Sequence, residues 1–567
     1  MNSRKRKLQK RPHHNECHNT QPCALPAQVD VCVIGGGASG ICAAICAAEA
    51  GASVCVIEKE STCGKSILKT GNGACNFCTT QLNCNAYNAP QFVRDAFAGL
   101  CAVLPDDVQL ADVLSWQSPA GATTAAADSP AASAADSTAS TRVLAHILHF
   151  FARAGLVWNV KETRMYPLSN KASTIQDVLL ARLHATRAHV CAAREVVALE
   201  ALDEPSAADT AGTTDVAADS AAGYRWRVET KATPAATTAH KGSTDVQLDA
   251  PQSSVVRAKT VVIATGGVST LGFVPRELAC APFVGKLCPL TCEKSTLFAL
   301  DGTRFKATIS LMRGGTQVFC EDGEILIRSW GLSGIVVFNA SRVARAGDVL
   351  MCNILPSFTH DALAQLIYTR LQPFDGAALS TSDARLRTTI EQCLLGLLDK
   401  SAARVIAEHF MDNMHNAQPH QAVAGAHTQQ TSDAQKRAYA QLLAQCLQEI
   451  TLVVTGTTHT NTAQVHQGGI ALSEIVPRTL ESTTYHGMFA CGEALDIDGA
   501  CGGYNLSWAW ASGMLAGIQS ARCAGAMVHA TRYSHWHATH KPRNQTHHTN
   551  ERHKRTPCAL LITNEDP

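Results

Sequence analysis

One stretch near the start of this 567-residue chain restricts the possible fold more than any other feature. An apolar run, VDVCVI (29–34), leads into Gly35-x-Gly37-x-x-Gly40, and a helical pattern follows. A second apolar run then ends at Glu58. This order of strand, glycine turn, helix, strand and acid is typical of the first unit of a Rossmann-type parallel α/β sheet that binds a dinucleotide.

Each residue type in the turn has a physical task. Gly35 permits the tight turn, Gly37 leaves room for a pyrophosphate to approach the backbone, and Gly40 allows helix and strand to pack closely. The helix opens with Ala38 and Ser39, where unpaired amides and the positive end of the helix dipole favour phosphate. We therefore expect the phosphates of a dinucleotide at this helix start.

The acid at the end of the second strand adds a contact to ribose. Glu58 follows Gly40 by eighteen residues, so it can accept hydrogen bonds from the adenosine ribose hydroxyls and its charge would repel a 2′-phosphate. This stretch alone leaves NAD and FAD equally open.

Two later stretches favour FAD. VVIATGG (261–267) is a buried strand that ends in a turn at Gly266, and residues 487–517 carry a strand to Glu493, a glycine-rich turn and a helix that begins near Asn505. The amides at the start of that helix can lie against a flavin ring and stabilise negative charge on its reduced form. A chain that bound NAD alone would not need this second site.

The rest of the chain divides by pattern. Short β-like runs between about 285 and 355 indicate a β-rich domain, and residues 357–450 have helical spacing. Stretches near 117–141 and 203–254 (203–223 and much of 230–254) are rich in Ala, Ser and Thr and are interpreted as low-complexity insertions. We expect disordered tails at 1–27 and 527–567.

Composition limits the partners and the compartment. A formal net charge of +1 argues against nucleic acid as a partner, and the apolar windows are too interrupted to predict a membrane span. The 23 cysteines are scattered through apolar runs, which fits reduced thiols and a cytoplasmic protein. Histidines in the C-terminal tail are irregularly spaced, and no metal site is predicted. The pattern does not specify an oligomeric state.

With these stretches in view, the chain resembles the BaiN-like (aminoacetone oxidase-like) family of NAD(P)/FAD-dependent oxidoreductases. The resemblance rests on collinear segments: EKESTCGKSILKTGNGACNFC (58–78), 150–183, VVIATGGVS (261–269), WGLSGIVVFNASR (330–342), 454–475 and FACGEALDIDGACGGYNLSWAWASG near the end. It implies a discontinuous Rossmann-type FAD-binding domain (28–275 and 451–525) with an inserted β-barrel-like domain (280–356) and a helical subdomain (357–450).

The resemblance also implies site residues. Those expected at FAD are Gly35, Gly37, Ala38, Ser39, Gly40, Glu58, Lys59, Lys65, Ser66, Asn72, Val196, Gly266, Glu493, Asn505 and Leu506. Those expected near the reacting part of the flavin are Cys75, Asn76, Arg164 and Tyr166.

Two departures from the family pattern put its activity in question. Ala74 stands where the family loop has an arginine, and the segment after Gly267 is shortened. Cys75 and Cys78 have the spacing of a redox-active pair, although the family loop carries only the first cysteine.

The expected chemistry is flavin hydride transfer. The first hypothesis is an oxidoreductase that acts on a small or medium organic substrate, with NAD(P)H as a transiently bound reductant. The alternatives are a flavin-dependent RNA-modifying enzyme, and a flavoprotein of lost or weakened activity that serves as a binding partner.

Overall fold

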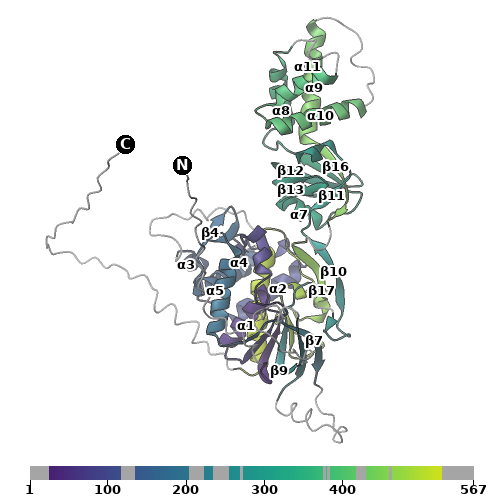
Figure 1. Ribbon diagram of the computed structural model, residues 1–567. Helices are drawn as coiled ribbons and strands as arrows, with labels where there is room; N and C mark the ends of the chain where they lie inside the picture. The colour runs from purple at the N-terminus through teal and green to yellow at the C-terminus, as the bar shows by residue number, and fades with distance from the viewer. Residues whose placement is uncertain are drawn as a thin grey trace, which may run out of the picture. The chain divides into compact units, whose positions relative to one another are not determined.

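A seven-stranded sheet organises the part of the chain that contains both glycine-rich turns (Figure 1). The computed structural model describes residues 25–115, 134–202, 223–233, 254–267, 272–374, 379, 383–416, 429–458 and 463–526. The strands of this sheet are β1 (Gln28–Ile34), β2 (Val54–Ile57), β6 (His189–Cys191), β7 (Arg194–Ala201), β8 (Trp226–Ala232), β9 (Ser254–Ile263) and β18 (Met488–Ala490).

The strand order is that of a Rossmann-type sheet. It runs β6-β2-β1-β9-β8-β7, with β18 also beside β9. Five strands run parallel to one another: β1, β2, β6, β9 and β18. β8 pairs antiparallel with β9 on one side and with β7 on the other. The centre of β1 is fully buried, as the unbroken apolar run predicts for a parallel strand covered on both faces. The expected α/β fold is confirmed.

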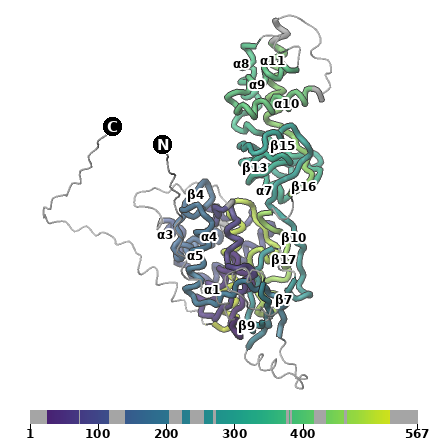
Figure 2. Tube along the Cα trace, in the orientation of Figure 1, coloured from purple at the N-terminus to yellow at the C-terminus, as the bar shows by residue number. Residues whose placement is uncertain are grey.

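Helices pack on this sheet and on one another. They are α1 (Ala38–Glu49), α2 (Pro90–Val103), α3 (Leu110–Ser115), α4 (Ala134–Arg153), α5 (Ala172–Ala185) and α12 (Tyr504–Cys523). α12 lies against α1, so segments from the two ends of the described chain run side by side (Figure 2). Two glycines make this possible, because a Cβ at Gly513 would lie 2.4 Å from Ser39 O and one at Gly517 would lie 2.3 Å from Ala43 O.

A small sheet completes this part of the molecule. β4 (Trp158–Lys161) and β3 (Cys78–Thr79) both pair with β5 (Arg164–Pro167), and β3 contacts α12. A Cβ at Gly503 would lie 2.6 Å from the carbonyl carbon of Cys78. The start of α12 is therefore pressed against the backbone of β3.

The β-rich domain is a closed barrel of order β11-β14-β13-β12-β15-β16. Its strands are β11 (Leu290–Cys292), β12 (Arg304–Arg313), β13 (Thr316–Arg328), β14 (Gly331–Ser333), β15 (Val349–Asn353) and β16 (Ile450–Thr457). Alternate residues of β12, Ala307, Ile309 and Leu311, are buried in its interior. The short helix α7 (Ile335–Ser341) packs against β13.

Helices inserted between β15 and β16 form the helical unit. They are α8 (His360–Leu371), α9 (Asp383–Leu394), α10 (Lys400–Asn416) and α11 (Gln429–Gln448). Thr359 caps α8, its side chain accepting a hydrogen bond from Ala362 N. Buried side chains of the barrel and of these helices belong to one hydrophobic cluster, so the two units share a core.

The observed elements shift several expected boundaries. β10 (Cys280–Lys286) pairs with β17 (Val465–Ile470) outside the barrel, and the barrel takes its sixth strand from β16, which the expected boundary at 451 assigned to the FAD-binding domain. Sequence pattern marks strands but not their distant partners, which explains this difference.

The low-complexity interpretation also needs correction in part. α4 begins at Ala134, inside the stretch 117–141. β8 begins at the buried Trp226, between the stretches 203–223 and 230–254, and its last three residues extend into the second of them. Contacts with β7 and β9 fix β8 although its flanks are rich in Ala and Thr. The tails 1–24 and 527–567 and the rest of these stretches lie outside the described residues.

Within the described residues, no helix combines the length and apolarity needed to span a membrane. The described cysteines are all free thiols, and most are buried.

Candidate functional site

The first glycine turn has the geometry that the sequence predicts. Gly35 has a φ of 103°, and a Cβ there would lie 2.5 Å from Ala264 O. A Cβ at Gly40 would lie 1.9 Å from Gly35 O, so this position must be glycine for α1 to pack on β1. At Gly37 the nearest atom to a Cβ would be Ser66 Oγ at 3.4 Å, which leaves space in front of this residue.

The N-terminus of α1 is open to an anion. Gly37 occupies the N-cap without a side-chain hydrogen bond, and the first turn, which includes Ala38 and Ser39, carries no acidic residue. Its free amides and the positive end of the helix dipole are therefore directed at the space beside Gly37. A diphosphate fits this combination of space, amides and charge.

Glu58 is buried at the end of β2 and holds the turn in place. One carboxylate oxygen accepts a hydrogen bond from Gly36 N at 2.7 Å, and the other accepts one from Glu60 N at 2.8 Å. Each oxygen has a further lone pair. Glu58 thus lies beside the glycine turn, where the ribose contact was expected.

The loop after β2 brings only part of the expected set to the turn. Ser66 faces Gly37, whereas Lys59 is exposed and Lys65 forms an ion pair of 3.0 Å with Glu60. Lys65 is therefore already paired with a carboxylate. The backbone of Asn72 lies in this loop, but its side chain lies outside the described set.

Val196 lies in β7, next to the end of β2. The first residue of β7, Arg194, donates its backbone N–H to Glu58 O at 2.9 Å. The pairing of β7 with β8 shifts register between Val196 and Ala198, so Val197 is an extra residue of a β-bulge. Such a bulge leaves backbone groups available beside the expected adenosine, and the contact of Val196 with adenine stays a prediction.

The second glycine turn opens α12. Gly502 and Gly503 have φ values of 125° and 102°, and Gly503 is the N-cap without a side-chain hydrogen bond. No acidic residue lies in the first turn of this 20-residue helix. Its amides are the candidates for contact with the flavin ring.

Asn505 supports this turn through its own side chain. Its Oδ1 accepts a hydrogen bond from Gly499 N at 2.7 Å, and its Nδ2 donates to Gly499 O at 2.9 Å. The amide is therefore engaged with the loop, which leaves the backbone of Asn505 and Leu506 as the part that a cofactor can contact.

Glu493 lies between the two glycine-rich segments. Gly266 has a φ of 70°, and a Cβ there would lie 4.0 Å from a carboxyl oxygen of Glu493. Burial raises the pKa of Glu493 to about 7, with a further contribution from the charge of Asp498 and an opposing hydrogen bond from the backbone of Gly267. The contact of Glu493 with the ribityl chain of FAD stays a prediction.

The cysteine pair lacks the properties of a redox centre. Cys75 and Cys78 are both buried, and burial raises the pKa of each thiol to about 11. The sulfur of Cys78 lies 3.3 Å from the hydroxyl of Ser507 in α12. Reactive cysteines need a lowered thiol pKa and access, so these thiols fit structural roles.

The other residues expected near the reaction differ in their surroundings. Asn76 Oδ1 is buried without a hydrogen-bond partner in the described part of the chain, which leaves an acceptor for a bound molecule. Arg164 lies 3.6 Å from Glu162, and Lys161 lies over the ring of Tyr166 at 5.6 Å. Arg164 also acts electrostatically on Glu321 of the barrel and on Cys501.

A cavity of about 310 Å³ lies between the barrel and the turn that precedes α12. Its volume is at the lower end of the range for small-molecule sites. The lining residues are Asn88, Phe319, Glu321, Asn339, Arg342, Val343, Gln467, Asp498 and Ala500.

Hydrogen bonds tie the barrel side of the cavity to the second glycine turn. Asn339 Nδ2 donates to both carboxyl oxygens of Glu321, at 2.9 and 3.0 Å, and Asn339 Oδ1 accepts from Cys501 N at 2.7 Å. Arg342 Nε donates to Asp498 at 2.9 Å. Because Cys501 lies three positions before the start of α12, the cavity adjoins the expected flavin end.

The residues that build this cavity were not predicted as site residues. Asn339 and Arg342 lie in WGLSGIVVFNASR and Asp498 lies in LDIDG, both within segments that carry the family resemblance. Glu321 lies in none of these segments. The two motifs were therefore a usable signal, whereas only the folded barrel brings Glu321 to the turn before α12.

Comparisons with known proteins identify the family. The family described as HI0933-like protein Rossmann domain matches residues 220–519, and the family described as FAD dependent oxidoreductase matches residues 30–83.

Among curated proteins, the chain is 27% identical over 512 residues to the 3-dehydro-bile acid delta(4,6)-reductase of Clostridium scindens, covering 86% of this chain and 98% of the relative. It is 23% identical over 504 residues to the ribosomal RNA dihydrouridine synthase of Escherichia coli, covering 85% and 96%.

Among solved structures, the comparison found the 3-ketosteroid-delta4-(5alpha)-dehydrogenase of Rhodococcus jostii in complex with 4-androstene-3,17-dione. It has a TM-score of 0.38 and 13% identity, with 89% of this chain and 99% of that chain covered.

The expected family is thereby confirmed, and the residues fit the cofactor. The open N-terminus of α1 fits the phosphates, Glu58 fits the ribose, and the open N-terminus of α12 fits the ring. The chain belongs to the HI0933-like family and is an FAD-dependent oxidoreductase.

Proposed function

We propose that the protein reduces a carbon–carbon double bond conjugated to a carbonyl group in a medium-sized organic substrate, with NAD(P)H as the electron donor. The observation that carries the proposal is the cavity between the barrel and the turn before α12. It holds a carboxyl, Glu321, beside the expected flavin end, and a double-bond reduction needs both a hydride and a proton.

The proton has a candidate source in this cavity. Burial raises the pKa of Glu321 above its usual value, opposed by the hydrogen bonds from Asn339 and by the charges of Arg164 and Arg342. A carboxyl with a raised pKa retains a proton nearer to neutral pH and acts more effectively as a general acid. Asn339 orients this carboxyl through both of its oxygens.

The remaining groups suit a substrate that carries a carbonyl. FAD, when bound, supplies hydride transfer to and from its ring. The amide of Gln467 lines the same cavity and is able to donate a hydrogen bond to a carbonyl oxygen. The amide of Asn88 already donates to Asp496 O at 3.1 Å and retains one further N–H. With the oxygen held, Glu321 delivers its proton to the carbon next to the carbonyl, and the hydride adds to the far carbon of the double bond.

The names of the relatives support this reaction class. Both names indicate saturation of a carbon–carbon double bond, one by a 3-dehydro-bile acid delta(4,6)-reductase and the other by a ribosomal RNA dihydrouridine synthase. The two names differ in the substrate, a free small molecule in one case and ribosomal RNA in the other. The bile acid reductase has the higher identity, which favours a free organic substrate for this chain.

NAD(P)H fits as a donor that binds and leaves. The chain has one GxGxxG turn of the Rossmann type, and FAD accounts for it. A nicotinamide donor would then reach the ring through the same cavity as the substrate, and the two would react in alternation.

An anaerobic two-step experiment tests the proposal. NADH and NADPH are added separately to FAD-loaded protein, and at least one should bleach the oxidised flavin band. A conjugated enone, such as cyclohex-2-enone or a 3-oxo-4-ene steroid, should then restore the band and yield the saturated ketone. If neither nucleotide bleaches the flavin, the donor is wrong. If a chemically reduced flavin is not reoxidised by any enone, the substrate class is wrong.

RNA modification is a second candidate, favoured by relatives named as ribosomal RNA dihydrouridine synthases. Ribosomal RNA therefore forms a parallel arm of the experiment. Reoxidation of the reduced flavin by RNA, together with salt-sensitive binding, would select this candidate over a free substrate. A flavoprotein that has lost its activity is the remaining possibility, and Ala74 and the short segment after Gly267 would be consistent with it. Such a protein would retain FAD, but neither an enone nor RNA would reoxidise its reduced flavin.

A further inference from the structure

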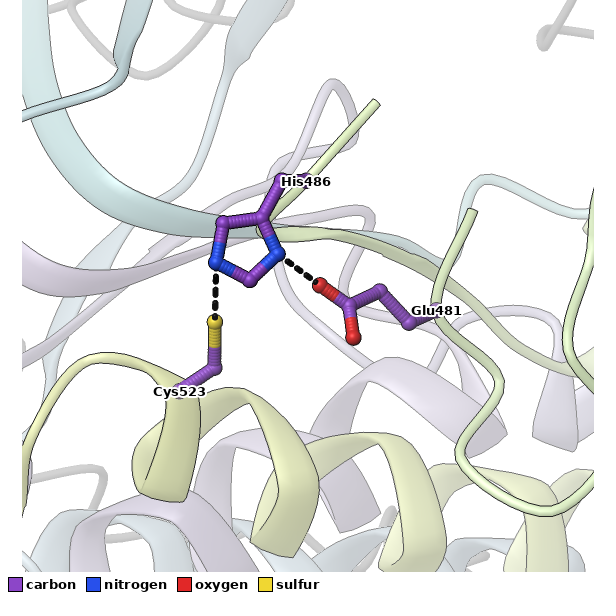
Figure 3. Close-up of side chains that lie close together, drawn as sticks. All are labelled: Glu481, His486 and Cys523. Atoms are coloured by element: carbon purple, nitrogen blue, oxygen red, sulfur yellow. Dashed lines mark hydrogen bonds and ion pairs between the residues drawn. The ribbon is translucent and has the colours of Figure 1, made fainter. Parts of the chain in front are cut away.

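A second group of chemically active side chains lies at the far end of α12. Cys523 is the last residue of α12, and Glu481 and His486 come from the segment before β18 (Figure 3). A donor atom of each side chain lies within 4.8 Å of the other two. A helix of 20 residues is roughly 30 Å long, so this cluster is far from the flavin end of α12.

The hydrogen bonds of this cluster define the state of the imidazole. His486 Nδ1 lies 2.7 Å from a carboxylate oxygen of Glu481, and the same oxygen accepts a hydrogen bond from Gly487 N at 2.9 Å. A carboxylate acceptor places the imidazole proton on Nδ1, which leaves the lone pair on Nε2. That nitrogen faces the sulfur of Cys523 at 3.9 Å (Figure 3).

This arrangement is the one that proteins use to hold a metal-binding histidine. A carboxylate that accepts from one ring nitrogen fixes the tautomer and orients the other nitrogen toward the ion. Nitrogen and thiolate donors suit zinc and related transition metals, whereas magnesium and calcium prefer oxygen. The side chain of His486 is 65% exposed, so an ion can enter and water can complete its coordination.

We propose that Cys523 and His486 bind a divalent cation of the zinc class through Sγ and Nε2, with Glu481 holding the imidazole and solvent filling the remaining positions. Binding replaces the thiol proton of Cys523 by the metal. The charge of Arg225 acts on Cys523 and opposes a cation, and the carboxylate of Glu481 together with the new thiolate outweighs it.

A nucleophilic Cys–His–Glu triad fits the same residues less well. Burial and the charge of Glu481 raise the pKa of the Cys523 thiol, whereas a nucleophile needs it lowered. Cys523 also lies at the C-terminus of α12, where the negative end of the helix dipole opposes a thiolate. A bound cation overcomes this opposition.

Cobalt(II) titration of full-length, FAD-loaded protein tests the site, because a thiolate ligand adds a charge-transfer absorption in the near ultraviolet. The difference spectrum should show this band, and zinc should remove it by competition. Cys523→Ser should abolish the band, and Glu481→Gln should weaken cobalt binding by about 10- to 100-fold, as for other residues that orient a metal-binding histidine. Cys320→Ser, a change of an exposed thiol on β13, is the matched control and should leave the band intact.

The result separates this site from other ligands of the chain. Cobalt bound in the C-terminal tail, where Cys558 lies among the histidines, would give a thiolate band that persists in Cys523→Ser. Absence of the band, or a band that persists in Cys523→Ser, would overturn the proposal. His486→Ala provides a second check, because cobalt affinity that is unchanged in this variant would also contradict the assignment.

Discussion

The folded protein opposes ionisation of the Glu493 carboxyl, so its free energy of unfolding depends on pH. Its folded pKa of about 7 lies above the ordinary value of 4.5, so the protonated form is favoured. The stability that this group contributes is fully present below pH 4.5 and is lost as pH rises through 7. A shift of this size corresponds to at most about 3 kcal/mol.

We therefore predict that Glu493→Gln changes the pH dependence of the FAD-free protein. Between pH 5 and 8, the free energy of unfolding of the wild type should fall by up to about 3 kcal/mol relative to that of Glu493→Gln, because the amide does not ionise. Urea unfolding at both pH values measures this. Parallel profiles for the two proteins would show that the surroundings do not oppose ionisation.

Glu321 carries the second prediction at this scale. Glu321→Gln keeps the shape of the side chain, and its amide oxygen can still accept a hydrogen bond from Asn339 Nδ2, but the transferable proton is lost. Reoxidation of reduced flavin by an enone should therefore slow by about 10²- to 10⁴-fold. Flavin reduction by the nicotinamide donor should stay near the wild-type rate. Stopped-flow measurement of each half-reaction separates the two, and equal slowing of both would indicate a structural role.

Single residues also show where the sequence pattern stops being informative. The pattern places Glu58 at the end of the second strand and the start of the last helix near Asn505, and the structure agrees on both, since β2 ends at Ile57 and α12 begins at Tyr504. It does not tell which way a side chain points, and the amide of Asn505 proves to be engaged with Gly499. Glu321 was missed because β13 reaches the turn before α12 only in the folded molecule.

At the scale of elements, the two glycines of the first turn separate folding from binding. Gly37→Ala places its Cβ 3.4 Å from Ser66 Oγ, so the protein should fold but bind FAD more weakly, because the methyl group occupies space meant for phosphate. Gly40→Ala places its Cβ 1.9 Å from Gly35 O and should destabilise the fold itself. Thermal unfolding and flavin-binding titration check both variants. A Gly37→Ala protein with unchanged FAD affinity would argue against this phosphate position.

The contact between α1 and α12 gives a further prediction. Gly513→Ala would bring its Cβ to 2.4 Å from Ser39 O, so the helices must separate, at a cost of about 1–3 kcal/mol. Denaturant unfolding of this variant should show that loss, together with weaker flavin binding. Gly272→Ala is the control, because no atom of the described residues lies within 4 Å of its added Cβ, and it should unfold like the wild type.

Elements with local signals were the ones that the sequence could predict. The strand–turn–helix unit from β1 to β2 follows from adjacent residues, and so do the helices α8 to α11. β16 was assigned to the wrong unit because its partners β11 and β15 lie about a hundred residues or more earlier in the chain. Two of the short β-like runs expected between 285 and 355, TQVFC (316–320) and EILIR (324–328), form one strand, β13, because β12 pairs with both of them.

At the scale of the whole molecule, the barrel and the helical unit depend on each other. Their buried side chains form one cluster, and β16 returns from α11 to close the barrel. Hydrogen exchange in denaturant should therefore show β12 and α8 losing protection together. Loss of protection in α8 well before β12 would mean that the helices unfold as an independent unit.

The central claim is that one FAD binds at the open N-termini of both α1 and α12. Flavin uptake by the full-length chain tests this claim most directly. FAD added in excess to stripped protein, followed by removal of the unbound fraction, should leave one FAD per chain. A chain that remains colourless under these conditions would contradict the account.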